Sequence, residues 1–369
     1  TTRNFTSIGL AQGIHSGVIS AIMKYHYTEF LRVLVNDSFD ILGGTAITKG
    51  PHNLLTSIYM TVPVGITVEG ANIMTRNLMI FGQGLMRCHP FAYKLMQSCI
   101  NKNIKDFDRS LWQYLLYLIS TSLRALLYTV TRGPLWFNPF KAISRHKRKI
   151  TWITATFTLL SNAALFKYGG DLKRQENVTA RLGDVLSNLY FALTIIKRAQ
   201  EQGYGTNKAY TEWTLGFLYQ RMQLALTELT DNITGPLAWF YRIILRINPV
   251  STSMSDKLDA RLAAMLQDTQ QCSSLVADSY IPKDTQEPLS ILTNTAIAVE
   301  QASGAYAKIK HAIKEGRLPK NKPASLIHTA AEQNIISAQE AKQLEHVEKL
   351  RYQALSVDAF SQKEYFTNR

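Results

Sequence analysis

Hydrophobic positions recur every three to four residues along most of the chain, and long runs that alternate between apolar and polar residues are absent. Gly and Pro cluster at a few breaks between these runs. The pattern therefore predicts an all-α fold. We expect helices over 8–40, 53–60, from after Gly70 to Cys88, a short one from Pro90, and 108–131, 140–168, 171–201, 207–231, 235–246, 255–278, 288–315 and 324–355.

Local signals indicate where some of these helices begin and end. Gly43 and Gly44 end the first run, because glycine tolerates the left-handed conformation that follows a helix. We expect a second break near Pro63 and Gly65. Ser337, followed three residues later by Glu340, fits a capping box at the start of the last helix.

Composition limits the class of protein. The 369 residues suggest about two domains, and 46% hydrophobic residues are enough to build a core. Three cysteines without CxxC spacing argue against a disulfide framework and favour a reducing compartment. No spacing of histidines fits a metal site, so we expect no bound metal. A net charge of +14 favours nucleic acid, anionic lipid or a phosphate-bearing ligand, without choosing among them.

The candidate chemistry lies around Glu69. This acid ends an apolar run that contains Val62, Val64, Ile66 and Val68, and a predicted helix follows it. Apolar surroundings raise the pKa of a carboxylate, which would make Glu69 a usable base near neutral pH. Gly70 would let a ligand approach the backbone, and free N–H groups at the helix start favour an anion or a polarised carbonyl. The alternative is that Glu69 only compensates the helix dipole.

A set of spaced motifs resembles the C-terminal helical domain of acyl-CoA dehydrogenases. Gly43-Gly44 ends a helix, Glu69-Gly70 follows about 25 residues later, and Arg76 lies seven positions after Glu69. Lys24 stands where the family often has a lysine. The variant VEGANIMTRNLMIFGQG, followed by RCHP, is most similar to the large bacterial (FadE-type) members, which carry an extended helical C-terminal region.

The resemblance implies two helical domains and a mechanism. Residues 1–95 would be part of the dehydrogenase helical domain, half of a four-helix bundle, and 96–369 an additional helical domain. Glu69 would remove the α-proton of a fatty acyl-CoA, and the β-hydrogen would pass to FAD as hydride, giving trans-2-enoyl-CoA. Val68 and Gly70 would contact the substrate. Ala71 and Asn72 would contact FAD, and Gly43 and Gly44 would line the adenine–pyrophosphate region of the FAD of a neighbouring subunit. Arg76 would be structural, in an ion pair or cap.

The resemblance also implies partners. Electrons would leave through an electron-transfer flavoprotein; an oxidase that uses oxygen is the alternative. We expect a homodimer or higher homo-oligomer in the cytoplasm, with inner-membrane association as a further expectation. In the family, a helical domain and a β-domain precede this region. Because the chain begins at Thr1 without Met, we expect it to be a C-terminal part that neither holds FAD tightly nor turns over acyl-CoA alone.

The positive charge gathers in one segment. Residues 102–149 hold ten basic residues and two acids, a net charge of +8, beside the apolar helix expected at 108–131. This combination suits peripheral contact with an anionic membrane through 108–149; a bundle helix beside a solvated basic face is the alternative. We expect no nucleic-acid binding, because no recognition motif accompanies the charge. A non-catalytic scaffold, docking or oligomerisation module is the alternative to an enzyme.

Overall fold

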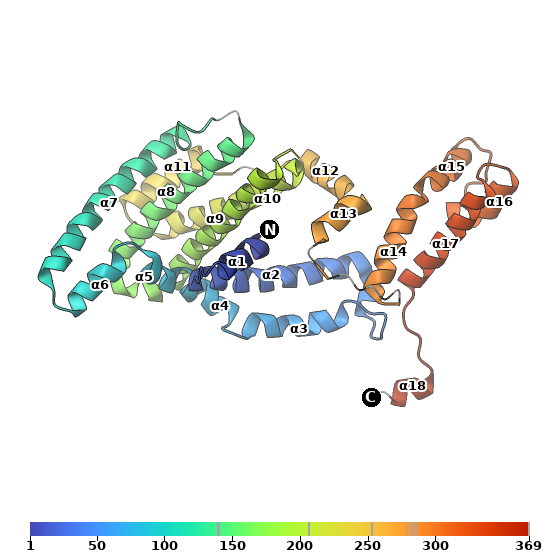
Figure 1. Ribbon diagram of the computed structural model, residues 1–369, viewed down its shortest axis with the longest axis horizontal. Coiled ribbons are helices and arrows are strands. Elements are labelled where there is room, and N and C mark those ends of the chain that lie inside the picture. The colour runs from blue at the N-terminus through green and yellow to red at the C-terminus, as the bar shows by residue number, and fades with distance from the viewer. Residues whose placement is uncertain are drawn as a thin grey trace. The chain divides into compact units, whose positions relative to one another are not determined.

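The computed structural model describes residues 1–138, 141–205, 207–251, 254–277, 279–280, 282, 284 and 286–367. Within these ranges the chain forms helices and no strand, so the all-α prediction is confirmed (Figure 1). The α-helices are α1 (Thr2–Ala11), α2 (Gly17–Leu42), α3 (Thr56–Thr67), α4 (Asn72–Met74), α5 (Gly84–Cys88), α6 (Ala92–Ile100), α7 (Ile104–Thr131), α8 (Ala142–Tyr168), α9 (Glu176–Gln202), α10 (Lys208–Asn232), α11 (Pro236–Ile247), α12 (Asp256–Leu266), α13 (Thr269–Val276), α14 (Pro288–Gln301), α15 (Ser303–Lys314), α16 (Ile327–Glu332), α17 (Ala338–Leu355) and α18 (Gln362–Thr367).

Four tighter or wider helical segments complete the set. The 3₁₀ segments are η1 (Gly43–Ile47), η3 (Gly169–Arg174) and η4 (Pro323–Leu326), and η2 (Thr75–Gln83) is a π-helix. A π-helix of this length is unusual, because π geometry is mostly confined to single turns. The predicted helix from Gly70 to Cys88 therefore exists, but η2 makes up its middle.

The chain forms two compact units. Unit 1 contains Thr1–Glu29 and Val64–Leu262, and unit 2 contains Phe30–Pro63 and Ala263–Arg369. Unit 1 holds the Glu69 segment, and unit 2 holds Gly43 and Gly44. The division into 1–95 and 96–369 remains a prediction.

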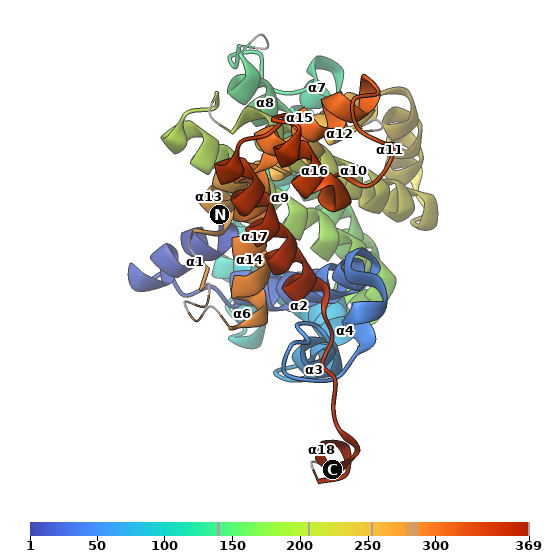
Figure 2. The same ribbon diagram turned by 90° about the vertical axis from the view of Figure 1, so that its right-hand side faces the viewer.

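The core of unit 1 lies among α8, α9 and α10, with η2 packed on α9. Helices α9 and α10 lie side by side (Figure 1 and Figure 2). Their apolar residues recur at helical spacing and are almost completely buried, as for Trp152, Ile153, Leu182, Val185, Leu215, Met222 and Leu226. Ile22 of α2 and Ile80 and Phe81 of η2 join the same core. Burial of this apolar face holds η2 against α9.

Unit 2 has a smaller core of its own in its C-terminal part. Buried residues of α15, α16 and α17 meet there, among them Ile309, Ala330 and Leu344. The capping box predicted for the last long helix is confirmed: Ser337 Oγ accepts from the Glu340 backbone N–H at 3.1 Å, and Glu340 Oε2 accepts from the Ser337 N–H at 2.8 Å.

Several predicted helix boundaries are wrong. The first run is two helices, α1 and α2, because Gly13 adopts φ +81° between them. The break near Pro63 is absent, since α3 runs through this proline to Thr67. A helical proline removes only one backbone hydrogen bond, to the carbonyl of Tyr59, and Tyr59 is exposed, where water can replace that bond.

The last three long predictions each divide. Asp268 begins α13 by accepting from the Gln271 N–H at 3.0 Å, which splits 255–278. Ala302 separates α14 from α15. Asn334 adopts φ +57° between α16 and α17. Periodicity alone missed these breaks because the apolar spacing continues across them.

Candidate functional site

The segment between α3 and α4 turns sharply at Glu69 and Gly70. Glu69 has φ +56° and Gly70 has φ +98°. For a residue with a side chain, the left-handed conformation costs about 1 kcal/mol or more. Such strain persists only where the surroundings hold the chain in place. The conformation of the turn is therefore maintained by contacts with the rest of the fold.

Lys24 of α2 holds this turn from one side. Its ammonium Nζ donates to the carbonyl oxygen of Gly70 at 2.6 Å and to the more distant carbonyl oxygen of Ile66 at 3.5 Å. It also donates to Oδ1 of Asn72 at 2.6 Å. The positive charge thus lies at the C-terminal end of α3, where the helix dipole favours a cation.

Asn72 holds the turn from the other side. Its side chain is buried, and its amide nitrogen donates to Oγ1 of Thr28 and to Oε1 of Glu29, both at 2.8 Å. Together with the bond from Lys24, both ends of the amide are used within the protein. The structure thus gives Asn72 a positioning role; the predicted contact of Asn72 with FAD remains a prediction.

Glu69 itself is left unpaired. Within the described part of the chain, neither its carboxylate nor its backbone N–H makes a hydrogen bond or ion pair. The side chain is exposed, and so are the apolar neighbours Val64, Val68, Ile73 and Met74. The apolar burial expected from the sequence is therefore wrong for this chain alone, because α3 turns most of its apolar side chains outward and buries only Val62.

The other predicted ligand-contacting residues are small and accessible. Gly43 adopts φ +60° at the end of α2, and a Cβ on Gly43 or Gly44 would meet no atom within 4 Å. Both are exposed, and Ala71 is half-buried. Gly43 and Gly44 therefore leave room for a ligand to approach the backbone. The contacts of Gly43, Gly44 and Ala71 with FAD remain predictions. Gly43 and Gly44 lie in unit 2 and Ala71 in unit 1.

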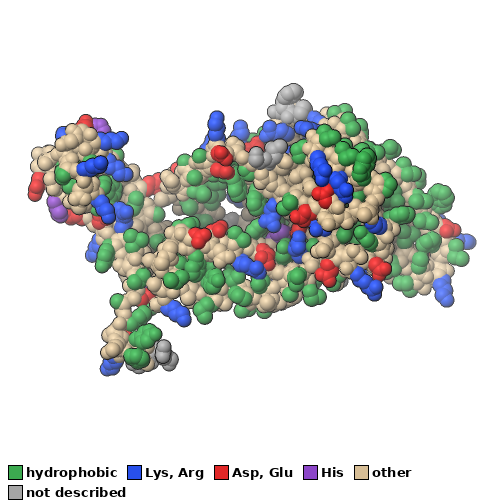
Figure 3. Space-filling view, turned by 180° about the vertical axis from the view of Figure 1, so that it is seen from behind, with side chains coloured by type: hydrophobic (Ala, Val, Ile, Leu, Met, Phe, Trp, Pro, Cys, Tyr) green, Lys and Arg blue, Asp and Glu red, His purple; other side chains and the backbone are tan. Residues whose placement is uncertain are grey.

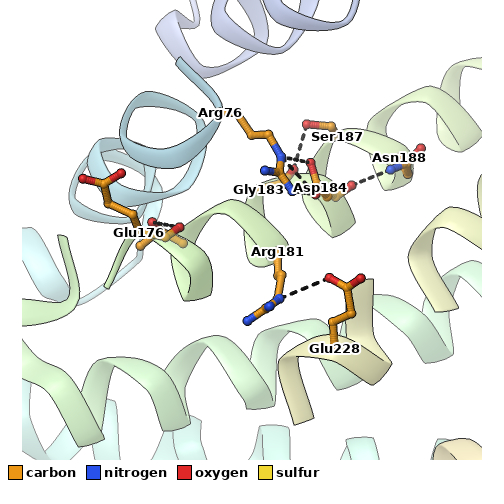
Figure 4. Close-up of polar contacts among 9 residues, drawn as sticks. Arg76, Glu176, Arg181, Gly183, Asp184, Ser187, Asn188 and Glu228 are labelled. Carbon is orange, nitrogen blue, oxygen red and sulfur yellow. Dashed lines mark hydrogen bonds and ion pairs between the residues drawn. The ribbon is translucent and has the colours of Figure 1, made fainter. Parts of the chain in front are cut away.

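The π-helix η2 anchors this segment to α9. Arg76 Nη2 pairs with Asp184 Oδ2 at 2.6 Å, and Arg76 Nε donates to Asp184 Oδ1 at 3.0 Å (Figure 4). A Cβ on Gly183 would lie 3.2 Å from the Arg76 carbonyl oxygen, so the two backbones approach closely. Thr179 Oγ1 donates to the carbonyl of Asn77. The predicted structural role of Arg76 is confirmed.

Neither a candidate metal site nor a membrane-spanning helix occurs in the described ranges. No group of three or more His, Cys, Asp or Glu residues lies close enough there to hold a metal ion. None of the helices in that part of the chain combines the length and apolarity needed to span a membrane.

Comparison with known proteins identifies the family. The sequence profile described as "Acyl-CoA dehydrogenase, C-terminal, bacterial type" matches residues 86–360. The chain belongs to this family. A crystal structure of an acyl-CoA dehydrogenase complexed with FAD from Bacillus anthracis has a similar fold, with a TM-score of 0.51 and 16% sequence identity over 68% of the present chain and 40% of that chain. The chain thus spans well under half of that dehydrogenase.

The family assignment confirms the resemblance, but the matched residues do not include the turn at Glu69 and Gly70. The matched range begins at residue 86, after Glu69, Gly70, Ala71 and Asn72. The roles of these residues, and those of Val68, Gly43 and Gly44, depend on the motif spacing and on the geometry of the turn. The sequence indicates Lys24 only by its position. Its three hydrogen bonds show that it holds the turn at Glu69 and Gly70.

Proposed function

We propose that this chain is the C-terminal part of an FAD-dependent acyl-CoA dehydrogenase that oxidises fatty acyl-CoA to trans-2-enoyl-CoA in fatty-acid β-oxidation. Glu69 is the base that removes the α-proton of the substrate. The family assignment supports the class of enzyme. One observation supports Glu69 as the base: its carboxylate is unpaired and lies on a strained turn that Lys24 and Asn72 hold in place.

Glu69 can serve the reaction at two atoms. Its carboxylate can accept the α-proton, and its free backbone N–H can donate to the thioester carbonyl, on which negative charge develops as the proton leaves. A residue that met its own hydrogen-bonding needs within the fold could do neither. Gly70 and Val68, exposed on either side, would line the substrate's path, and Gly70 has no side chain to block it.

FAD, when bound, accepts the β-hydrogen of the substrate as hydride. In this chain, Ala71 would lie against FAD, and Asn72 would act through its hold on the turn. Gly43 and Gly44 would line the FAD of a neighbouring subunit. These few contacts are not a complete cofactor site. We therefore expect the purified 369-residue polypeptide to contain no stoichiometric flavin; a full flavin absorbance spectrum after purification would contradict this.

The test of the base uses the longer enzyme of which we propose this chain is a part. Glu69→Gln keeps the size of the side chain and removes the charge, and we expect acyl-CoA oxidation to fall by about 10²- to 10⁴-fold. Glu201→Gln is the control, since Glu201 is an exposed acid in unit 1 that pairs with Lys197 on its own helix. Unchanged oxidation by Glu69→Gln would favour the alternative of a non-catalytic scaffold.

We propose an electron-transfer flavoprotein as the electron acceptor, and a homodimer or higher homo-oligomer as the assembly. Both follow from the family. Reoxidation of the reduced enzyme by purified flavoprotein, compared with reoxidation by oxygen, separates a dehydrogenase from an oxidase.

A second candidate function rests on α7. Six large apolar residues, three or four positions apart, form an exposed stripe on this helix: Trp112, Leu116, Ile119, Leu123, Leu127 and Val130. Figure 3 shows hydrophobic side chains gathered at the end of unit 1 where α6 to α8 lie. The opposite face of α7 buries Ala125 and Tyr128 in the core. An apolar stripe next to a basic segment suits an anionic lipid surface.

We propose that a cytoplasmic enzyme contacts the inner membrane peripherally through 108–149. Co-sedimentation with phosphatidylglycerol vesicles tests this: binding should fall with salt, with neutral lipid and in Leu123→Glu. Binding that responds to none of these would contradict it. A change of oligomeric state in Leu123→Glu without lipid would assign the stripe to self-association.

A further inference from the structure

A second polar cluster lies in unit 1, away from the residues proposed for catalysis. It surrounds an open cavity of about 350 Å³ between α8, α10 and the start of α12. Arg145 and Lys149 face it from α8, one turn apart, and Glu212 and Tyr219 face it from α10. Ser255 closes one side. Gly216, between Glu212 and Tyr219, has no side chain, and the side chain of Met254 packs closely against it.

Glu212, the one acid among the described lining residues of this cavity, already has partners within the fold. Glu212 pairs with Arg145 at 3.0 Å and with His146 Nε2 at 3.3 Å, and the hydroxyl of Tyr204 donates to it. The close approach of His146, with further contributions from Tyr204 and Arg145, lowers the pKa of Glu212 to about 2. Glu212 therefore stays charged, and its oxygen atoms are shared among three partners.

Lys149, in contrast, has no hydrogen-bond acceptor or ion-pair partner in the described part of the chain. Its ammonium lies 4.6 Å from the centre of the Tyr219 ring. Burial lowers the pKa of Lys149 to about 8. The nearby positive charges of Arg145 and Arg132 act in the same direction, and the negative charge of Glu212 acts in the opposite one. An ammonium has three donors and is strongly hydrated, so removing it from water without an acceptor is unfavourable.

The charges around the cavity do not balance. Among the lining residues, Arg145 and Lys149 supply two positive charges and Glu212 one negative charge. Arg132, outside the lining, adds a further positive charge near Lys149. Arg145 is partly exposed, so its guanidinium can reach a group in the cavity. A phosphomonoester carries a charge of about −1.5 to −2 near neutral pH and has three acceptor oxygens. This charge and this number of acceptors fit the surplus and the free donors of Lys149.

We propose that the cavity between Lys149, Arg145 and Ser255 binds the phosphomonoester group of a ligand. Lys149 provides the unpaired charge, Arg145 a second set of donors, and Ser255 a hydroxyl at the rim. The group can belong to a soluble compound or to the headgroup of an anionic lipid. The proposal is independent of the role of Glu69.

The test follows the reactivity of Lys149 in the 369-residue polypeptide. Amine acylation at a pH near 8, read by mass spectrometry, should modify Lys149 faster than Lys147, because more of Lys149 is neutral. Lys147 lies on the same helix, outside the cavity. Inorganic phosphate should restore the charge of Lys149. At pH 8, a rise of one unit in the pKa of Lys149 lowers its neutral fraction from about one half to about one tenth, so its acylation should slow about 5-fold. Sodium chloride at equal ionic strength should leave the rate unchanged.

A second arm separates the two sources of the phosphate. Protection of Lys149 by inorganic phosphate, but not by vesicles of phosphatidic acid in phosphatidylcholine, assigns the cavity to a soluble ligand. Protection by these vesicles and not by inorganic phosphate assigns it to a lipid headgroup. If neither protects Lys149, or if chloride protects it equally, the proposal is wrong.

Variants provide an independent check. Arg145→Gln should reduce the protection by phosphate, whereas Lys147→Gln should keep it. Circular dichroism and the thermal midpoint show whether each variant is folded. If Arg145→Gln is unfolded, Ser255→Ala replaces it and should also reduce protection. Full protection in a folded Arg145→Gln variant would contradict the assignment of donors.

Discussion

Two unpaired charges in unit 1, the Glu69 carboxylate and the Lys149 ammonium, are held in opposite ways. Glu69 is exposed and keeps its solvation, and the strain lies in its backbone. Lys149 is half-buried on an unstrained helix, and the cost lies in its lost hydration. The exposed charge of Glu69 is thus recognised by the strained backbone that carries it. The charge of Lys149 is recognised by its missing hydrogen-bond acceptor.

The largest effect that tests this comparison is on stability at Lys149. Its pKa is about 8 in the folded protein, against 10.5 for an ordinary lysine. The unfolded chain therefore binds more protons between these values, and stability rises with pH from about 8 to 10.5. Lys149→Met removes the buried charge, so near pH 7 it should raise the free energy of unfolding by about 1 to 3 kcal/mol.

Chemical denaturation at several pH values measures this effect. The gain from Lys149→Met should shrink as the pH rises, whereas Lys147→Met should change stability little at any pH. A loss of stability in Lys149→Met near pH 7 would show that the ammonium has a partner in the fold, and the contrast with Glu69 would disappear.

The next effect is at Lys24, the residue that holds the Glu69 turn. Lys24→Met leaves the carbonyl of Gly70 and Oδ1 of Asn72 without their donor. We expect unit 1 to lose about 1 to 2 kcal/mol of stability. Lys94→Met is the control, because Lys94 is exposed on α6. Equal stability of both variants in denaturant would mean that the turn is held by other contacts.

The smallest effect tests the strain at Glu69 itself. Glycine adopts φ +56° without the steric cost of a side chain, so Glu69→Gly should gain about 1 kcal/mol of stability. Lys102→Gly is the control, since Lys102 has φ +52° outside the proposed site and should gain a similar amount. The thermal midpoint of both variants should rise. A fall in Glu69→Gly alone would show that its side chain stabilises the turn.

Much of the fold could be predicted from the sequence. The spacing of apolar residues in α8, α9 and α10 identified the helices that form the core, and Ser337 with Glu340 identified a helix start. The continuous helix through Pro63 and the breaks that divide the three long C-terminal helices could not be predicted. They depend on solvent exposure and on contacts with residues far away in the sequence. The π geometry of η2 depends in the same way on its packing against α9.

The site was predictable to a different extent. Spacing identified Glu69, and the ion pair of Arg76 with Asp184 agrees with a structural role. The hydrogen bonds by which Lys24 and Asn72 hold the turn could not be predicted from the sequence and are seen only in the structure. No motif indicates the Lys149 cavity, because Arg145 and Glu212 are 67 residues apart and meet only through the packing of α8 on α10.

The most direct measurement of the central claim is exchange of the substrate's α-hydrogen. In heavy water, the longer enzyme with wild-type Glu69 should exchange the α-hydrogens of a bound acyl-CoA for deuterium, as NMR or mass spectrometry of the recovered substrate can show. Glu69→Gln should slow this exchange by about 10²- to 10⁴-fold, and Glu201→Gln should leave it unchanged. Exchange at the wild-type rate in Glu69→Gln would contradict the assignment of Glu69 as the base.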